Sequence, residues 1–191
     1  MIFDKQIESR LSAVLPQKYV EMLLKRDPLP PLLCREIWNQ ELGNQLGQLT
    51  VERVSGTLKV DENQAGSIVC ALLLLNDDLK SSHVISQNIY TSSGSYLHGI
   101  IHRREGDFSN ARFWFNRVNH HSAFPAIVAR LKEARISSPS AELSRFLEQN
   151  EWSPFDFVDW CERASLPEFH DGENLQKIQW LEMLTMLEAC L

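Results

Sequence analysis

Four of the six histidines in the chain lie in one stretch, residues 95–121. His98 and His102 are four residues apart, and Glu105 follows three residues later. On a helix these positions share one face, so their side chains are within reach of one another. Two imidazoles one turn apart are good ligands for zinc or a related divalent ion. The spacing therefore indicates a metal site at this pair, to be completed by one of three side chains: Glu105, His83 or His120.

The same histidines also have a purely structural interpretation. Inside a helical hairpin they would be satisfied by hydrogen bonds to Asp107, to Asn110 or to backbone carbonyl groups. The chain contains no H-E-x-x-H motif that would raise the metal signal, and it contains no nucleophile elbow or phosphate loop. The residues leave both interpretations open and indicate no cofactor other than this metal.

Arginines are interleaved with these histidines, at Arg103, Arg104, Arg112 and Arg117. The guanidinium group can hold a carboxylate or phosphate through two parallel hydrogen bonds. The segment could therefore bind an anionic group. The alternative is a solvated helix face, on which the arginines pair with Glu105 and Asp107.

Composition limits the classes of function. The net charge of −6 argues against a general nucleic-acid binder, which needs a concentrated basic face. The longest apolar run is far shorter than a membrane span, and the first eleven residues lack the apolar region of a signal peptide. The four cysteines are widely separated, as is usual for buried thiols in a reducing compartment. We expect a cytoplasmic protein with no nucleic-acid or membrane partner.

The chain of 191 residues is long enough for one substantial core, and its hydrophobic pattern predicts a single all-α domain. N-terminal helices occupy residues 1–47, with a helical pair over 3–25 and a helix over 32–46. The segment 50–60 alternates and carries β-branched residues, which favours a short extended element. Eight helices follow in the central region 61–134 and the C-terminal region 139–191: 62–75, 79–89, 95–105, 108–119, 125–134, 140–149, 154–164 and 173–190.

A weak internal repeat runs through the central region. Placing Asp78 over Asp107, an offset of 29 residues, matches several apolar and small residues along the two following helices, although Ser86 then stands opposite Phe115. Both aspartates immediately precede a helix, where a carboxylate caps the first amide groups. Two similar helical hairpins in succession are typical of a solenoid-like array.

The second hairpin resembles a tetratricopeptide repeat through Gly99, Phe108, Ala111 and Phe115. A small residue lets two helices approach closely while an aromatic ring fills the space behind it. The likeness covers about 30 residues well. It has departures: His98 and His102 replace the leucine and tyrosine of the family pattern. The run LHGIIHRREGD, followed by Asn-Ala and a tryptophan, also resembles a family of bacterial proteins, and this second likeness implies no activity.

The tetratricopeptide resemblance implies a concave groove that holds an extended peptide or a small acidic molecule. In that pattern the residues that face the groove are Tyr96, Ile100, Arg103 and Arg104. The polar members of this set and neighbouring polar and aromatic side chains form the expected ligand-binding set: Tyr96, His98, His102, Arg103, Arg104, Asn110, Trp114 and His120.

The sequence thus supports two principal hypotheses. The first is a helical-repeat module that binds a peptide or small anion. The second is an enzyme or sensor with a histidine-rich pocket that binds a metal. A third hypothesis is a scaffold that oligomerises through the leucine-rich face of the last helix, residues 173–190.

Overall fold

A computed structural model describes residues 5–166, 169 and 171–191. Within these residues the regular secondary structure is entirely α-helical, which confirms the predicted fold class. The helices are α1 (Lys5–Ser12), α2 (Gln17–Leu24), α3 (Gln40–Leu46), α4 (Val51–Leu58), α5 (Glu62–Leu75), α6 (Leu79–Ser86), α7 (Ser92–Glu105), α8 (Phe108–Phe115), α9 (Phe124–Ala134), α10 (Ala141–Leu147), α11 (Pro154–Ala164) and α12 (Gly172–Cys190).

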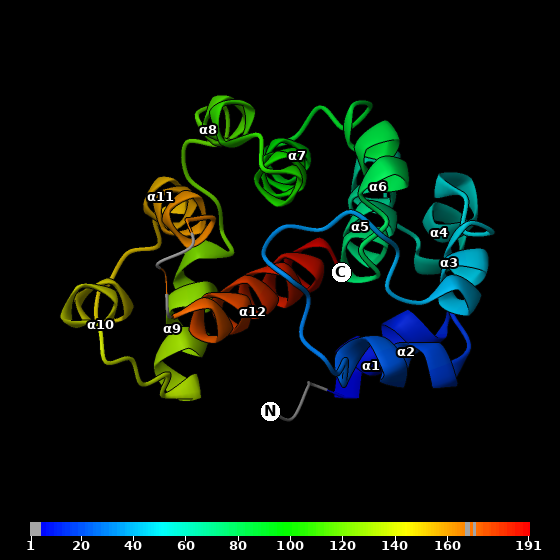
Figure 1. The fold of residues 1–191 in the computed structure, drawn as a ribbon. Helices are drawn as coiled ribbons and strands as arrows, with labels where there is room; N and C mark the ends of the chain where they lie inside the picture. Colours follow the sequence, from blue (N-terminus) through cyan, green and yellow to red (C-terminus); the bar gives the residue numbers. More distant parts are fainter. Residues whose placement is uncertain (1–4, 167–168, 170) are drawn as a thin grey trace.

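Three long helices form the centre of the molecule. α12 runs through the middle, with α9 and α11 on one side and α5 on the other (Figure 1). α5 is buried at every position from Ala65 to Leu75, and α12 at every position from Ile178 to Leu187. Helices that are covered on all sides show little amphipathic pattern, because neighbours replace solvent around their whole circumference. The third central helix, α7, contacts both of them.

Two consecutive hairpins, α5 with α6 and α7 with α8, position the histidines. α6 also packs against α7, so the two hairpins lie side by side. Asp78 and Asp107 cap α6 and α8 as predicted, accepting hydrogen bonds from the amides of Ser81 at 3.0 Å and Asn110 at 3.1 Å. The hairpin packing explains the small residue in α7. A Cβ atom on Gly99 would lie only 2.5 Å from the ring of Phe115.

The prediction of an extended element over 50–60 is wrong, because residues 51–58 form α4. Thr50 caps this helix by accepting a hydrogen bond from the amide of Arg53, and Lys59 ends it in the left-handed conformation. Val54 is fully buried, and Val51 and Leu58 pack against the core from the same face. The apparent alternation is therefore the apolar face of a short helix that packs on α5.

The predicted helix 32–46 begins only at Gln40, and the preceding residues form an irregular loop across the core. Hydrogen bonds to distant helices hold this loop: the amide of Cys34 donates to the carbonyl of Arg104, and that of Trp38 to the carbonyl of Asn76. α6 and α8 are also shorter than expected, ending at Ser86 and Phe115.

The start of the predicted first helix, Phe3, lies outside the described residues. None of the described helices combines the length and the apolar composition needed to cross a membrane.

The apolar residues of the last helix are used within the chain. Leu175, Ile178, Leu181, Leu184 and Leu187 are all buried among the other helices. This face of α12 therefore belongs to the core of one molecule, and oligomerisation through it stays a prediction without a free surface to support it.

Candidate metal centre

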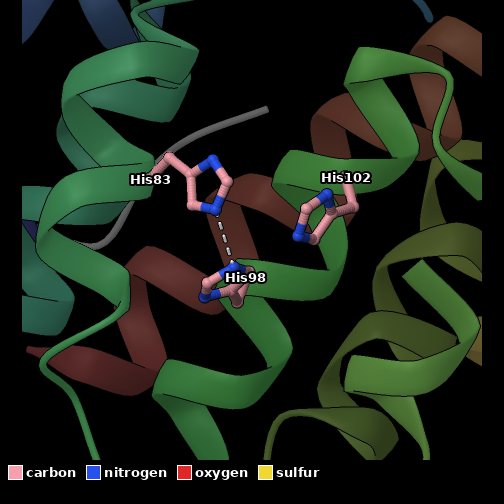
Figure 2. A group of neighbouring side chains, drawn as sticks. All are labelled: His83, His98 and His102. Atoms are coloured by element: carbon pink, nitrogen blue, oxygen red, sulfur yellow. Dashed lines mark hydrogen bonds between the residues drawn. The ribbon is translucent and has the colours of Figure 1, made fainter. Parts of the chain in front are cut away.

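Three histidines meet between the two hairpins. His83 lies on α6, while His98 and His102 lie one turn apart on α7. One ring nitrogen of each lies within 4.8 Å of those of the other two, and the Nε2 atoms of His83 and His98 are 3.0 Å apart. Figure 2 shows the three rings turned toward one another across the gap between the helices. The structure thus brings together three of the residues that the sequence proposed as ligands.

The outer nitrogen of His98 has a defined partner. Ser86, the last residue of α6, has its hydroxyl oxygen 3.0 Å from Nδ1 of His98. The same hydroxyl lies 2.9 Å from the carbonyl of His83, to which it donates. In the tautomer that satisfies both contacts, Nδ1 of His98 donates to the hydroxyl and Nε2 presents its lone pair to His83. This orientation of a ring by an outer hydrogen bond is usual for metal-binding histidines.

Glu105 lies behind the other two rings. Its carboxylate oxygens are 3.7 Å from Nδ1 of His83 and 3.3 Å from Nδ1 of His102. Among the described residues Nδ1 of His102 is buried without a hydrogen-bond partner. The carboxylate of Glu105 thus faces the outer nitrogens of His83 and His102, where it could orient both rings as metal ligands.

The environment favours neutral imidazoles. Burial, with the neighbouring His83 and His102, lowers the pKa of His98 to about 4. Burial also lowers the pKa of His102, although Glu105 opposes that effect. A histidine must be unprotonated to bind a metal, so these two side chains are in the required state at neutral pH.

Trp114 covers the cluster from α8. Its indole stacks on the ring of His98, with the ring centres 3.9 Å apart and the planes at 16°. The guanidinium of Arg117 lies over the same indole, 5.3 Å from its centre. Trp114, a member of the expected ligand-binding set, thus packs α8 against α7 within the second hairpin.

The structure does not place Tyr96, Arg103 and Arg104 in an open groove. All three are completely buried, because α7 is covered by α5 and α12 as well as by α6 and α8. The guanidinium of Arg103 pairs with both carboxylate oxygens of Glu182, which also accepts from the hydroxyl of Tyr96 at 2.7 Å. The expectation that these side chains face a concave surface is therefore wrong.

Arg104 takes part in a second buried network. It pairs with Asp77, which also pairs with Arg26, and it donates to the carbonyl of Leu74 at 2.9 Å. Buried charges of this kind are tolerated because they are paired and hydrogen-bonded. The positive charges of Arg103 and Arg104 are thus neutralised by carboxylates inside the protein.

The remaining two predicted ligand-binding residues lie outside the histidine cluster. Asn110 is exposed and donates to the Asp107 carboxylate at 2.6 Å, which reinforces the cap of α8. His120 is exposed beyond α8, with its ring 5.9 Å from that of Phe124. It does not belong to the group of three histidines.

The cluster fits a zinc-class ion in donor type. Zn–N bonds of about 2.0–2.1 Å place tetrahedral nitrogen ligands about 3.3 Å apart. The 3.0 Å separation between His83 and His98 differs from this by a few tenths of an ångström, and rotation of the rings can bring His102 inward. Cys34 lies in the adjoining cleft, but burial raises the pKa of its thiol, and its Sγ donates to the carbonyl of Glu36 at 3.2 Å. It is therefore not part of the donor set.

Comparison with protein-family models, with curated proteins and with solved structures finds no match. The likeness to a tetratricopeptide repeat stays a prediction based on four residues. The assignment of a function rests on the geometry of the site.

Sequence reasoning missed two kinds of residue at this site. Ser86, which orients His98, was visible only as the mismatch with Phe115 in the internal repeat. Arg35 and Lys80 line a cleft beside His83. Arg35 is distant from His83 in the sequence, and Lys80 lies outside the histidine-rich stretch 95–121. Nothing in the local pattern distinguishes these two cations from other surface charges.

Proposed function

We propose that the protein binds a divalent transition-metal ion of the zinc class through Nε2 of His83, His98 and His102. The supporting observation is the arrangement of both nitrogens of each ring. Inner nitrogens face one another, while Ser86 and Glu105 lie at the outer nitrogens. The hydrogen bond between the Nε2 atoms of His83 and His98 holds a proton where a metal ion would lie, and metal binding would release it.

Three histidine ligands leave one tetrahedral position for water or another exchangeable ligand. This is the pattern of catalytic zinc sites, whereas structural sites are closed by four protein ligands. The centre is thus suited to an enzyme or sensor, the function that combines metal binding with a changeable fourth ligand. The alternative groove for a peptide loses its main support, because Arg103 and Arg104 are buried and paired.

The test is a zinc titration of metal-free protein with a competing chromophoric chelator. Wild-type protein should bind one equivalent of zinc. His98→Ala and His102→Ala should each weaken binding by more than the roughly 10-fold to 100-fold that loss of an outer hydrogen-bond partner costs. His120→Ala is the matched control, because it removes an exposed histidine outside the cluster. Circular dichroism verifies that each variant is folded.

Cobalt gives a second readout of the same centre. Co²⁺ bound by three imidazoles in a four-coordinate site should produce visible absorption bands that His120→Ala retains and His98→Ala loses. Failure of wild-type protein to bind zinc or cobalt in stoichiometric amount would overturn the proposal. Equal binding by wild type and folded His98→Ala would overturn it as well.

A further inference from the structure

A surface cleft of about 630 Å³ adjoins the histidine cluster. It lies between the loop that precedes α3, the start of α6 and the end of α7, and it shares His83 and Glu105 with the cluster. The side chain of His83 is 27% exposed and that of Glu105 34% exposed, whereas His102 is 11% exposed. The histidine cluster is therefore most exposed on the side of this cleft.

The cleft contains two cationic side chains that are available to a ligand. Arg35 comes from the loop and Lys80 from the first turn of α6, and both are exposed. Within the part of the chain that the structure describes, neither forms an ion pair. They differ in this respect from Arg103 and Arg104, whose charges are neutralised inside the protein.

The carboxylates of the cleft are already engaged. Asp77 pairs with Arg26 and Arg104, Asp78 caps α6 by accepting from the amide of Ser81, and Glu105 faces the outer nitrogens of two histidines. Among these three described carboxylates only Asp77 is paired with cations, so the formal charges of Asp78 and Glu105 balance those of Arg35 and Lys80. A metal ion on neutral histidines would then give the cleft a net positive charge, and together with the two cations it would attract negative oxygen atoms.

We propose that this cleft binds a small molecule with two anionic groups, one oxygen entering the open metal position and the other group lying between Arg35 and Lys80. This inference rests on the proposed metal centre. The shared chemistry is that of phosphates and dicarboxylates, which both present oxygen atoms to a metal and accept charge-assisted hydrogen bonds from cations. The ligand is thereby a small anion, and the metal is part of its binding site.

The experiment uses protein loaded with one equivalent of Zn²⁺ or Co²⁺, with pyrophosphate and malonate, which each carry two anionic groups, as separate probes at constant ionic strength. Calorimetry on the zinc form should detect binding of at least one probe, and that probe should shift the visible bands of the cobalt form. The probe that binds more tightly distinguishes a phosphate ligand from a dicarboxylate ligand.

The variant Arg35→Ala/Lys80→Ala should retain one equivalent of metal and lose about tenfold or more in affinity for the probe, because it removes charge-assisted hydrogen bonds. The charge-matched control is Arg53→Ala/Lys132→Ala, which removes two exposed cations outside the cleft and should behave like wild type. Metal-free wild-type protein should bind the probe more weakly than the zinc form.

Metal content separates the two levels of failure. If wild-type protein binds no metal, both the metal centre and the anion site are overturned. If it binds metal but neither probe, or if the cleft variant and its control bind the probe equally, the anion site alone is overturned.

Discussion

At the scale of single residues, Ser86 and Glu105 account for much of the site. Neither is one of the three proposed metal ligands, but Ser86 and Glu105 face the outer nitrogens of the three histidine rings. The histidine pair on α7 could be found from sequence because its spacing matches one helical turn. The role of Ser86 could not, because it depends on the lateral packing of α6 against α7.

The first prediction concerns Glu105→Gln. The substitution preserves side-chain size but removes the negative charge beside His83 and His102, so zinc affinity should fall by about 10-fold to 100-fold while the fold is retained. Competition titration measures the change, with the exposed Glu133→Gln as the control of equal charge. Unaltered zinc affinity in Glu105→Gln would show that this carboxylate does not orient the metal-binding histidines.

The second prediction concerns His121, which lies just before α9. Its Nδ1 accepts from the amide of Ala123 at 3.1 Å, so the ring must be unprotonated at that nitrogen. Burial, with the nearby His120, lowers the pKa of His121 below its ordinary value of 6.5. As the pH falls below about 6.5, the unfolded chain therefore binds a proton before the folded protein does, and the free energy of unfolding decreases.

Urea unfolding of metal-free protein between pH 7.5 and 5.5 measures this effect. His121→Asn should reduce the pH slope of the unfolding free energy by up to about 1.4 kcal/mol per pH unit, the limit for one proton. The exposed His120→Asn keeps His121 and should retain most of the wild-type slope. Identical slopes in wild type and His121→Asn would contradict the prediction.

At the scale of helices, hydrophobic periodicity located most elements, and α5 and α11 begin and end where predicted. The failures have tertiary causes. The residues before α3 carry a helical pattern, but the amide of Cys34 donates to Arg104 and that of Trp38 to Asn76, which holds the chain as a loop. This loop then supplies Arg35 to the cleft, so the error in secondary structure also concealed a cation of the proposed anion site.

The third prediction tests the contact between α7 and α8. In Gly99→Ala the added Cβ would meet Phe115 at 2.5 Å, so the free energy of unfolding should fall by about 1–3 kcal/mol. Gly56→Ala on α4 is the matched control, because its Cβ would meet no atom within 4 Å. It should stabilise the helix by about 0.5–1 kcal/mol. Urea unfolding distinguishes the two signs, and equal effects would contradict close packing at Gly99.

At the scale of the whole molecule, the ion pairs of the arginines could not be predicted from the sequence. Local charge suggested a basic surface, because nothing near Arg103 in sequence reveals Glu182 on the last helix. The ion pair between Arg103 and Glu182 depends on the packing of α12 against α7. All-α architecture is a local property of the chain and was predictable, whereas the destination of a charged side chain is a property of the complete fold.

The fourth prediction addresses this buried pair. Arg103→Met leaves the buried carboxyl group of Glu182 without its arginine, so the free energy of unfolding should fall by about 3–5 kcal/mol. Arg103→Met/Glu182→Leu removes both charges and should be more stable than the single variant, although the hydroxyl of Tyr96 then loses its acceptor. The control is Arg112→Met, whose partners Asp159 and Glu162 are exposed and whose cost should be about 1 kcal/mol or less.

Urea unfolding of the three variants provides the comparison. A single variant as stable as wild type would contradict the prediction, as would a double variant less stable than Arg103→Met.

Three successive residues of α7 point in three directions. Consecutive helical positions differ by about 100°, so His102 faces α6, Arg103 reaches Glu182 on α12 and Arg104 reaches Asp77 beyond α5. Turning α7 about its axis would break two buried ion pairs. The backbone positions of His98 and His102 are therefore fixed, and only rotation of the side chains can adjust the site to an arriving ion. Selectivity against ions that prefer six ligands would follow, because α7 cannot turn to bring further protein ligands to the site.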